Sequence, residues 1–401
     1  MPLFLTSARL TTRRAYGASG FFLREERRTG LLNAQSSREP SDRGFASARP
    51  GQRAGLVSPS ASRFRRWAPC LLAAAAAAAA ASAAADEPAP PATLRIGIIG
   101  LDTSHVIQFT KMINQQLLPE AEGARVVLAY PQGSPDIASS VSRVPGYIEQ
   151  VQAMGVEIVD TIEEVAAQCD AVLLETNDGR PHLRQALPVL KARKRMFIDK
   201  PMAGSLAEVI ALFDAAEHYQ TPIFSTSALR YGPNTLEVHG GAIGRVLGAD
   251  AFGPCSIEPT HPDLFWYGIH GVEALFTVMG VGCQTAARTS TADAESAAGV
   301  WEGGRIGTFR GMRVGAQQFG GMAFGEKENR PIGSYVGYEP LVADILKFFR
   351  GAAPPVTRAE TEEIFAFMEA ADESKRRGGT PVPLKDLIDR ARADAAQQRS
   401  W

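Results

Sequence analysis

The chain has 401 residues, of which 45% are hydrophobic and 21% are charged, so it is long enough for two packed domains and is not disordered throughout. Its net charge of −1 is uneven: residues 1–85 contain 13 Arg and four acids, so 29 basic and 39 acidic residues remain in the rest. A body with an excess of acids argues against nucleic acid as a partner. The four cysteines form no C-x-x-C pair, so neither a metal site nor a disulfide framework is predicted.

The first 85 residues are predicted to be a leader. Residues 1–56 are rich in Arg, Ser and Gly and lack apolar periodicity, so we expect no fold there. Residues 57–85 have the pattern of a secretory signal peptide, with a basic start at 63–66, an apolar run at 70–81 and small residues up to Ala85. We expect cleavage near Ala85, export to the periplasm or the extracellular space, and no stable membrane span. The alternative is an Ala-rich linker.

Apolar runs alternate with helical periodicity over residues 93–225. We expect strands near 94–100, 124–129, 157–159, 171–175, 195–198 and 222–225, and helices near 106–118, 145–154, 162–168, 181–192 and 206–219. This alternation predicts an α/β domain with a doubly wound parallel sheet of the Rossmann type.

The loop after the first strand departs from the dinucleotide-binding pattern. It contains Gly100, Asp102, Thr103, Ser104 and His105, so only the first Gly of G-x-G-x-x-G is present. Asp102 would place a carboxylate near a phosphate, and residues 129–132 lack the acid that holds a ribose hydroxyl, so dinucleotide binding is expected to be weak or unusual. Alternatively, these polar residues only cap the next helix.

Motifs further along resemble a known family. Residues 197–201 (FIDKP) follow Gly100 by about a hundred residues, residues 176–182 (TNDGRPH) resemble a T-P-x-x-x-H loop, and residues 243–246 (IGRV) resemble an I-G-x-(V/I) segment. Their order and spacing over about 93–384 resemble the Gfo/Idh/MocA family, the oxidoreductases named for glucose-fructose oxidoreductase and inositol dehydrogenase.

The resemblance implies an oxidoreductase that uses NAD or NADP and acts on a small carbohydrate or polyol. It also implies a second α/β domain over 226–384, with a large open, mostly antiparallel sheet whose outer face would form a homo-oligomer, and a tail at 385–401. From the residues themselves we expect strands near 249–255, 285–291, 297–302, 305–310 and 311–317, and helices near 273–279, 341–349 and 360–376. The implied cofactor-binding residues are Gly100, Asp102, Thr103, Ser104, His105, Thr176, Asn177, His182, Asp199, Lys200 and Pro201.

Catalysis is expected where the two domains meet. Lys200 is the predicted acid–base group, because burial brings an ammonium toward a neutral pKa. Residues 266–273 (WYGIHGVE) resemble a D-x-G-x-H-x-x-D segment, in which His270 is kept as the second catalytic residue and Trp266 replaces Asp. The expected substrate contacts are Lys200, Arg230, His261, Tyr267, His270 and Glu273.

Each of these residues also has a purely structural interpretation. In that case Lys200 is only an ion-pair partner of Asp199, and His270 is a buried structural histidine. Arg230 is a structural cation, and His261 is part of a surface loop. Three functions stay open: an exported NAD(P)-dependent oxidoreductase, a non-catalytic nucleotide- or ligand-binding protein on the same fold, and an NAD-dependent glycoside hydrolase.

Overall fold

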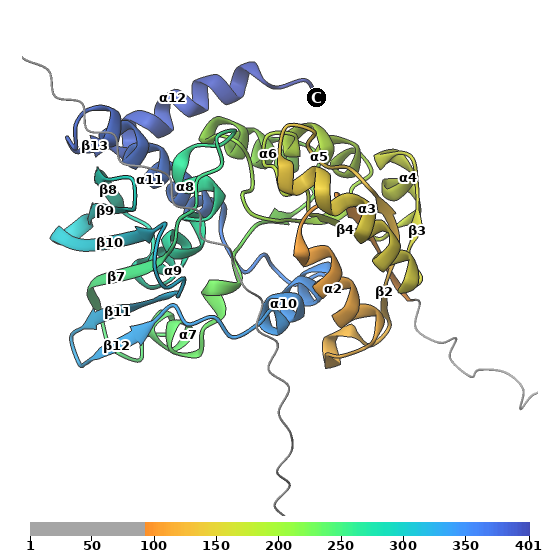
Figure 1. The fold of residues 1–401 in the computed structure, drawn as a ribbon, viewed down its shortest axis with the longest axis horizontal. Coiled ribbons are helices and arrows are strands. Elements are labelled where there is room, and N and C mark those ends of the chain that lie inside the picture. The colour runs from red at the N-terminus through yellow and green to blue at the C-terminus, as the bar shows by residue number, and fades with distance from the viewer. Residues whose placement is uncertain (1–92) are drawn as a thin grey trace, which may run out of the picture. The chain divides into compact units, whose positions relative to one another are not determined.

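The computed structural model describes residues 93–401, so the expected leader, its signal peptide and Cys70 lie outside the described residues. The first part is a six-stranded parallel sheet with the order β3-β2-β1-β4-β5-β6 (Figure 1). This order is that of a dinucleotide-binding doubly wound sheet, so the Rossmann-type prediction is confirmed. Its strands are β1 (Leu94–Ile99), β2 (Ala124–Tyr130), β3 (Glu157–Ile158), β4 (Ala171–Leu174), β5 (Arg195–Ile198) and β6 (Ile223–Phe224).

Helices cover both faces of this sheet, because its central strands are apolar on both sides. They are α2 (Ser104–Asn114), α3 (Ala138–Ala153), α4 (Ile162–Gln168), α5 (His182–Lys191) and α6 (Leu206–His218). The helix expected at 145–154 begins earlier, at Ala138, and Pro145 lies inside it rather than at its start. Pro145 misled the prediction because proline is common in the first turn of helices.

The second sheet has seven strands in the order β12-β11-β7-β10-β9-β8-β13, and of its pairs only β7–β10 is parallel. The mostly antiparallel sheet is therefore confirmed. Its strands are β7 (Val246–Pro254), β8 (Cys283–Ser290), β9 (Ala294–Trp301), β10 (Arg305–Met312), β11 (Gly320–Gly325), β12 (Asn329–Ile332) and β13 (Val382–Pro383). The strand expected over 311–317 is wrong. Strand β10 ends at Met312, and Gly315 has a φ of 81°, which extended strands do not adopt.

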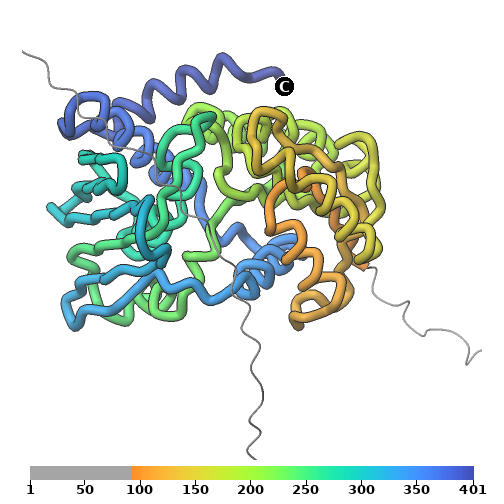
Figure 2. The backbone as a smooth tube through the Cα atoms, in the orientation of Figure 1, coloured from red at the N-terminus to blue at the C-terminus, as the bar shows by residue number. Residues whose placement is uncertain are grey.

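The helices around this sheet are α7 (Pro233–His239), α8 (Asp263–Trp266), α9 (Ile269–Met279), α11 (Arg358–Arg376) and α12 (Leu384–Gln397). Helix α10 (Glu339–Phe349) instead packs beside β5 and α2 of the first part. Three short 3-10 helices complete the elements: η1 (Pro119–Ala121), η2 (Ala228–Tyr231) and η3 (Glu302–Gly304). The segment expected to be a tail contains α12, which packs on α6 and α11 (Figure 2). The C-terminal helix thereby connects the two sheets' helical layers.

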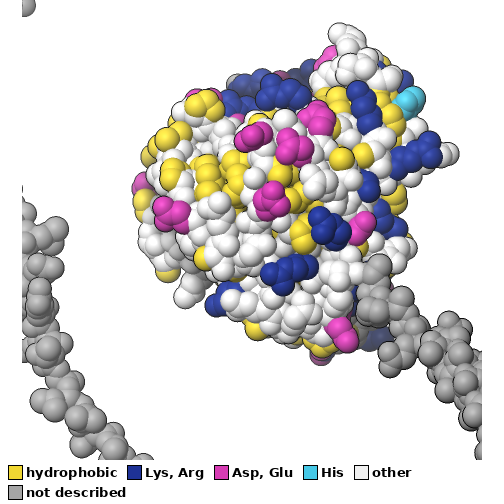
Figure 3. Space-filling model, turned by 90° about the vertical axis from the view of Figure 1, so that its right-hand side faces the viewer, with side chains coloured by type: hydrophobic (Ala, Val, Ile, Leu, Met, Phe, Trp, Pro, Cys, Tyr) yellow, Lys and Arg dark blue, Asp and Glu magenta, His cyan; other side chains and the backbone are white. Residues whose placement is uncertain are grey.

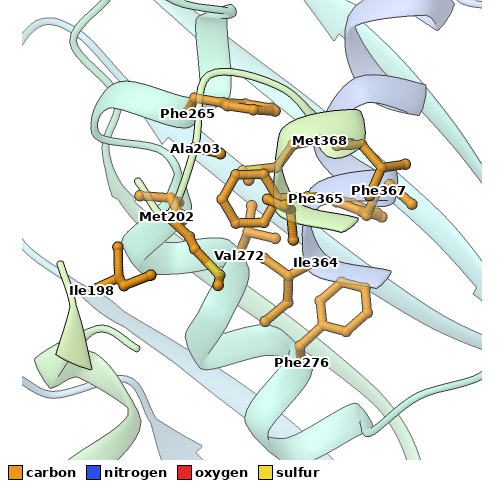
Figure 4. Packing of buried hydrophobic residues seen from close by; sticks show 14 of the residues in the cluster. Ile198, Met202, Ala203, Phe265, Val272, Phe276, Ile364, Phe365, Phe367 and Met368 are labelled. Atoms are coloured by element: carbon orange, nitrogen blue, oxygen red, sulfur yellow. The ribbon is translucent and has the colours of Figure 1, made fainter. Parts of the chain in front are cut away.

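One buried hydrophobic cluster joins the two sheets, which belong to one compact unit. Ile198 at the end of β5 and Met202 pack in it with Val272 and Phe276 of α9 and with residues of α11 (Figure 4). Ile198 and Met202 flank the Lys200–Pro201 segment. The core therefore fixes this segment relative to α9, the helix that contains His270.

The surface of the described residues contains charged side chains of both signs. Figure 3 shows the side with α3 and α4, where acidic and basic side chains both occur. Within residues 93–401, no helix is both long and apolar enough to cross a membrane. Cys169, Cys255 and Cys283 are free and buried, as expected for small apolar core residues.

Candidate active site

A cavity of about 410 Å³ lies at the carboxyl ends of β1, β4 and β5, where ligands of open α/β sheets bind. Its opposite wall comes from η2, α8 and α9 and from the loops around β11 and β12. The lining residues are Thr103, Ser104, His105, Ser139, Arg143, Asn177, Lys200, Ala228, Leu229, Trp266, Tyr267, His270, Phe319, Tyr335 and Tyr338.

The sequence-predicted residues divide into two groups in this structure. The cavity lining contains Thr103, Ser104, His105, Asn177, Lys200, Tyr267 and His270. The lining does not contain Gly100, Asp102, Thr176, His182, Asp199, Pro201, Arg230, His261 or Glu273. Most members of the second group are buried behind the first and support it.

Lys200 is the second residue after β5 and follows Asp199. Its side chain is largely buried. The backbone N–H of Lys200 donates to Asp199 Oδ1 at 2.8 Å, whereas Nζ lies 5.7 Å from the centroid of the Tyr267 ring. Burial lowers the pKa of Lys200 below its ordinary value, and the charge of Asp199 only partly opposes this. The ammonium therefore faces the cavity with a lowered pKa, as an acid–base group requires.

His270 lies in the first turn of α9, and its Nδ1 is 2.7 Å from Ser227 Oγ. Its ring meets Tyr267 and Phe319 edge-on. Burial, followed by the charges of Lys200 and His105, lowers the pKa of His270 well below its ordinary value. At neutral pH the ring is therefore uncharged and oriented by a hydroxyl group, which replaces the carboxylate that Trp266 cannot supply.

Glu273 and Arg230 form a buried ionic network behind His270. Glu273 accepts hydrogen bonds from Thr226 Oγ1 and from the Ser227 backbone N–H at 2.8 Å, and its carboxylate lies 3.2 Å from Arg230 Nε. Arg230 also pairs with Glu360 at 2.5 Å. The expectation that Arg230 and Glu273 contact substrate is not what the geometry shows. Instead, the network holds Ser227, which in turn orients His270.

Asp102 is completely buried and does not face the cavity. Its carboxylate accepts hydrogen bonds from the Asn177 N–H at 2.8 Å and from Ser140 Oγ at 2.7 Å. The expectation of a carboxylate near a phosphate is therefore wrong, because the side chain turns inward to satisfy these donors. Of the polar residues expected to cap α2, Thr103 is the N-cap.

Gly100 and His182 serve the backbone around the cavity. Gly100 has a φ of 93°, and a Cβ there would lie 2.5 Å from the Thr176 backbone nitrogen. The buried His182 ring bridges the carbonyl oxygens of Thr176 and Met202 at 2.9 and 3.0 Å. Both residues thus hold the loops after β4 and β5 in place.

His261 is neither in the cavity lining nor in an exposed loop. Its Nε2 lies 3.2 Å from Asp178 Oδ1, and its ring packs on Trp266 at a centroid distance of 5.0 Å. Both sequence interpretations of His261 are therefore wrong, because the pairing with Asp178 buries the ring. Within residues 93–401, no three His, Cys, Asp or Glu side chains are grouped so as to hold a metal ion.

Sequence reasoning missed several lining residues. Phe319, Tyr335 and Tyr338 come from loops around β11 and β12, and Arg143 comes from the part of α3 that was expected to precede the helix. The available signal was the presence of large aromatic residues in otherwise polar, Gly-rich segments.

Comparison with known proteins supports the family resemblance of the first sheet and its helices. Residues 94–226 match the GFO_IDH_MocA family model, described as an oxidoreductase family with an NAD-binding Rossmann fold. The match covers about a third of the chain, and this part is similar to the Gfo/Idh/MocA family. The match confirms the resemblance inferred from the motifs, and with it an oxidoreductase domain of the NAD-binding type. No curated protein matches the sequence.

Solved structures share the fold over both sheets. A probable dehydrogenase from Thermotoga maritima has 18% identity and a TM-score of 0.60, covering 74% of this chain and 100% of its own. The scyllo-inositol dehydrogenase from Lactobacillus casei, with NAD(H) and scyllo-inositol bound, has 14% identity and a TM-score of 0.59. The match covers 73% of this chain and 99% of the dehydrogenase. The WlbA dehydrogenase from Bordetella pertussis, in complex with NADH and UDP-GlcNAcA, has 18% identity and a TM-score of 0.57. The match covers 73% of this chain and 98% of WlbA.

The cavity fits the phosphate groups of the cofactor that this family binds. Thr103, Ser104 and His105 present the N-terminal turn of α2 to the cavity, and this turn contains no acidic residue. Arg143 lines the same wall. The His105 N–H donates to Thr103 Oγ1, whereas the remaining N–H groups of a helix N-terminus and a guanidinium are suitable donors for a pyrophosphate, and the helix dipole favours its negative charge. At the end of β2, where an acid would hold the ribose, Gln132 instead accepts a hydrogen bond from Gln185 at 2.8 Å.

Proposed function

We propose that the protein is an NAD(P)-dependent oxidoreductase that oxidises a hydroxyl group of a sugar, cyclitol or related compound, or reduces the corresponding carbonyl. The observation that supports this most is the meeting of Lys200 and His270 in one cavity, beside the N-terminal turn of α2. The nicotinamide, when bound, accepts or returns the hydride. The protein must then hold the substrate and move the hydroxyl proton.

The two predicted catalytic residues have different tasks in this proposal. Lys200 has a lowered pKa, so a fraction of its amine is uncharged and accepts the hydroxyl proton as the hydride leaves. His270 is held neutral and oriented by Ser227, so it hydrogen-bonds the substrate oxygen and fixes the reacting carbon. Loss of either group removes a contact that catalysis needs.

A ring-shaped, polar substrate fits the cavity walls. Tyr267, Phe319, Tyr335 and Tyr338 supply aromatic surface on which the C–H face of a ring can pack. The polar groups between them donate hydrogen bonds to hydroxyl oxygens. Support also comes from the solved relatives, whose ligands include scyllo-inositol and UDP-GlcNAcA.

The test is nicotinamide reduction by a panel of sugars and polyols, measured with wild-type protein and two lysine variants. Lys200→Met keeps the length of the side chain but removes its charge and donors, so turnover should fall at least about 100-fold with the fold intact. Lys191→Met, at an exposed position of α5, is the matched control and should keep the wild-type rate. An undiminished rate in Lys200→Met would exclude this mechanism.

We also propose that the protein is exported, on the grounds of the basic, apolar and small-residue pattern of residues 57–85.

Self-association through the outer face of the second sheet is a further proposal. Phe252, Val300 and Ile306 are exposed there, and Ile306 pairs directly with Val300. An apolar surface of this kind favours contact with a second copy. Ile306→Glu should lower the mass measured by light scattering, and an unchanged mass would contradict the proposal.

A further inference from the structure

His105 stands where the dinucleotide-binding pattern has its third Gly, and its side chain lies between the cavity and a buried carboxylate. Nδ1 is 2.7 Å from Asp199 Oδ2. The ring stacks on Phe109 at a centroid distance of 5.2 Å and meets Tyr338 edge-on at 4.8 Å. His105 lines the cavity, whereas Asp199 is 1% exposed behind it.

Asp199 is ionised in this arrangement. Burial acts to raise its pKa, but the contacts with His105 and Lys200 outweigh burial and lower the pKa below its ordinary value. A carboxylate on Nδ1 fixes the tautomer with the proton on that nitrogen. Within the described part of the chain, Nε2 of His105 has no hydrogen-bond partner, so it remains available to a ligand in the cavity.

A second carboxyl group, that of Glu175, lies next to Asp199 but does not supply the negative charge behind His105. Leu174 pairs with Ile198 in the parallel sheet, which places Glu175 beside Asp199. Glu175 is completely buried, and neither of its carboxyl oxygens has a partner among the described residues. Burial, with the charge of Asp199, raises the pKa of Glu175 well above its usual range. Glu175 is therefore neutral, and the negative charge behind His105 belongs to Asp199.

We propose that His105 is a further catalytic residue, which exchanges the proton of the reacting hydroxyl through Nε2 by way of Lys200, with Asp199 as its positioning residue. The proposal rests on the proposed oxidoreductase function. In oxidation, a bound nicotinamide would take the hydride from the C–H bond, while the uncharged Lys200 amine takes the proton of the O–H bond. Nε2 of His105 then takes that proton from the Lys200 ammonium, which lines the same cavity. The carbonyl forms, and Asp199 stabilises the resulting imidazolium. Reduction reverses each transfer.

His105 differs from His270 in what stabilises its charged form. The partner of His270 is the neutral Ser227 hydroxyl, whereas the partner of His105 is a carboxylate. The other charged or titratable groups that line the same cavity are Lys200, Arg143, Tyr267, Tyr335, Tyr338 and His270. Asp199 is the negatively charged group in contact with the His105 ring, so it stabilises the imidazolium when the ring takes up a proton.

The tautomer of the His105 ring, read by NMR from its ring ¹⁵N chemical shifts, tests the positioning role without any turnover. The chain has six histidines, and the signal absent from His105→Gln identifies the ring. Asp199→Asn removes the carboxylate that accepts from Nδ1, so the tautomer with the proton on Nδ1 should lose population to the other tautomer. Glu175→Gln makes the same carboxyl-to-amide change at the neighbouring position and should leave the tautomer unchanged, because Glu175 is already neutral. An unchanged tautomer in Asp199→Asn would overturn the positioning role.

The pH profile of turnover tests the catalytic role. His105→Gln should lower kcat about 100-fold and remove a pH-dependent limb of the profile. Wild-type kcat and an unchanged profile in His105→Gln would overturn the proposal while leaving the oxidoreductase function intact, provided that Lys200→Met is inactive. If Lys200→Met also keeps full activity, the proposed function itself fails, so the two failures are distinguishable.

Discussion

Replacing Arg230 by Met should destabilise the protein strongly, because Arg230 is the cation that Glu273 and Glu360 share. The side chains of Arg230, Glu273 and Glu360 are 5%, 5% and 12% exposed. Removal of one partner from a buried ion pair costs about 3–5 kcal/mol. At about 2–4 °C per kcal/mol for a domain of this size, the melting temperature should fall by about 6–20 °C.

The loss should depend on pH in a defined direction. Burial already raises the pKa of Glu273 above its ordinary value, and Arg230 opposes this rise. Without Arg230, the pKa in the folded state rises further, while the pKa in the unfolded state stays near about 4.3. As the pH rises above that value, the unfolded chain ionises more readily than the folded protein, so the variant loses stability. Below it, both states are protonated and this contribution disappears.

Urea denaturation at pH 4 and pH 7.5 measures both effects. The matched control is Arg245→Met, which removes an arginine whose ion pair with Glu326 is well exposed and which should show no measurable change. A loss below about 1 kcal/mol at pH 7.5, or an equal loss at both pH values, would refute the assignment of Arg230 to a buried structural network.

Two further predictions concern the cofactor loop and the leader. Asp102→Gly removes the acceptor for the Asn177 N–H and for Ser140, so NADH affinity measured by fluorescence should fall, and equal or tighter binding would show that Asp102 does not order the loop. In protein from native cells, N-terminal sequencing should find a mature chain that begins near Asp86. A mature terminus upstream of residue 57 would contradict the proposed signal peptide.

The first sheet was readable from sequence because its strands are buried on both faces. Continuous apolar runs such as LRIGII and AVLL are distinctive when separated by helical periodicity. The place of Lys200 and His270 in one cavity was also predictable, because each lies in a motif at a fixed place in the chain order. Sequence motifs locate such residues even when the surrounding loop has diverged.

Features that depend on distant partners were not readable. Strand β11 contains Gly320, Gly321 and Gly325, which disfavour strands, and it forms because β7 and β12 pair with it. The contact between His270 and Ser227 joins residues 43 positions apart. Asp102 was misread for the same reason, since its hydrogen-bond donors lie on α3 and in the loop after β4.

The central claim is that this cavity holds a nicotinamide cofactor beside Lys200 and His270. Titration of NADH and NADPH into the purified protein, followed by nicotinamide fluorescence, tests it most directly. The account predicts saturable binding of at least one of them with one site per chain, weakened when Arg143 is changed to Met. Absence of saturable binding of either nucleotide would contradict the account and favour a binding protein that has kept the fold without the cofactor.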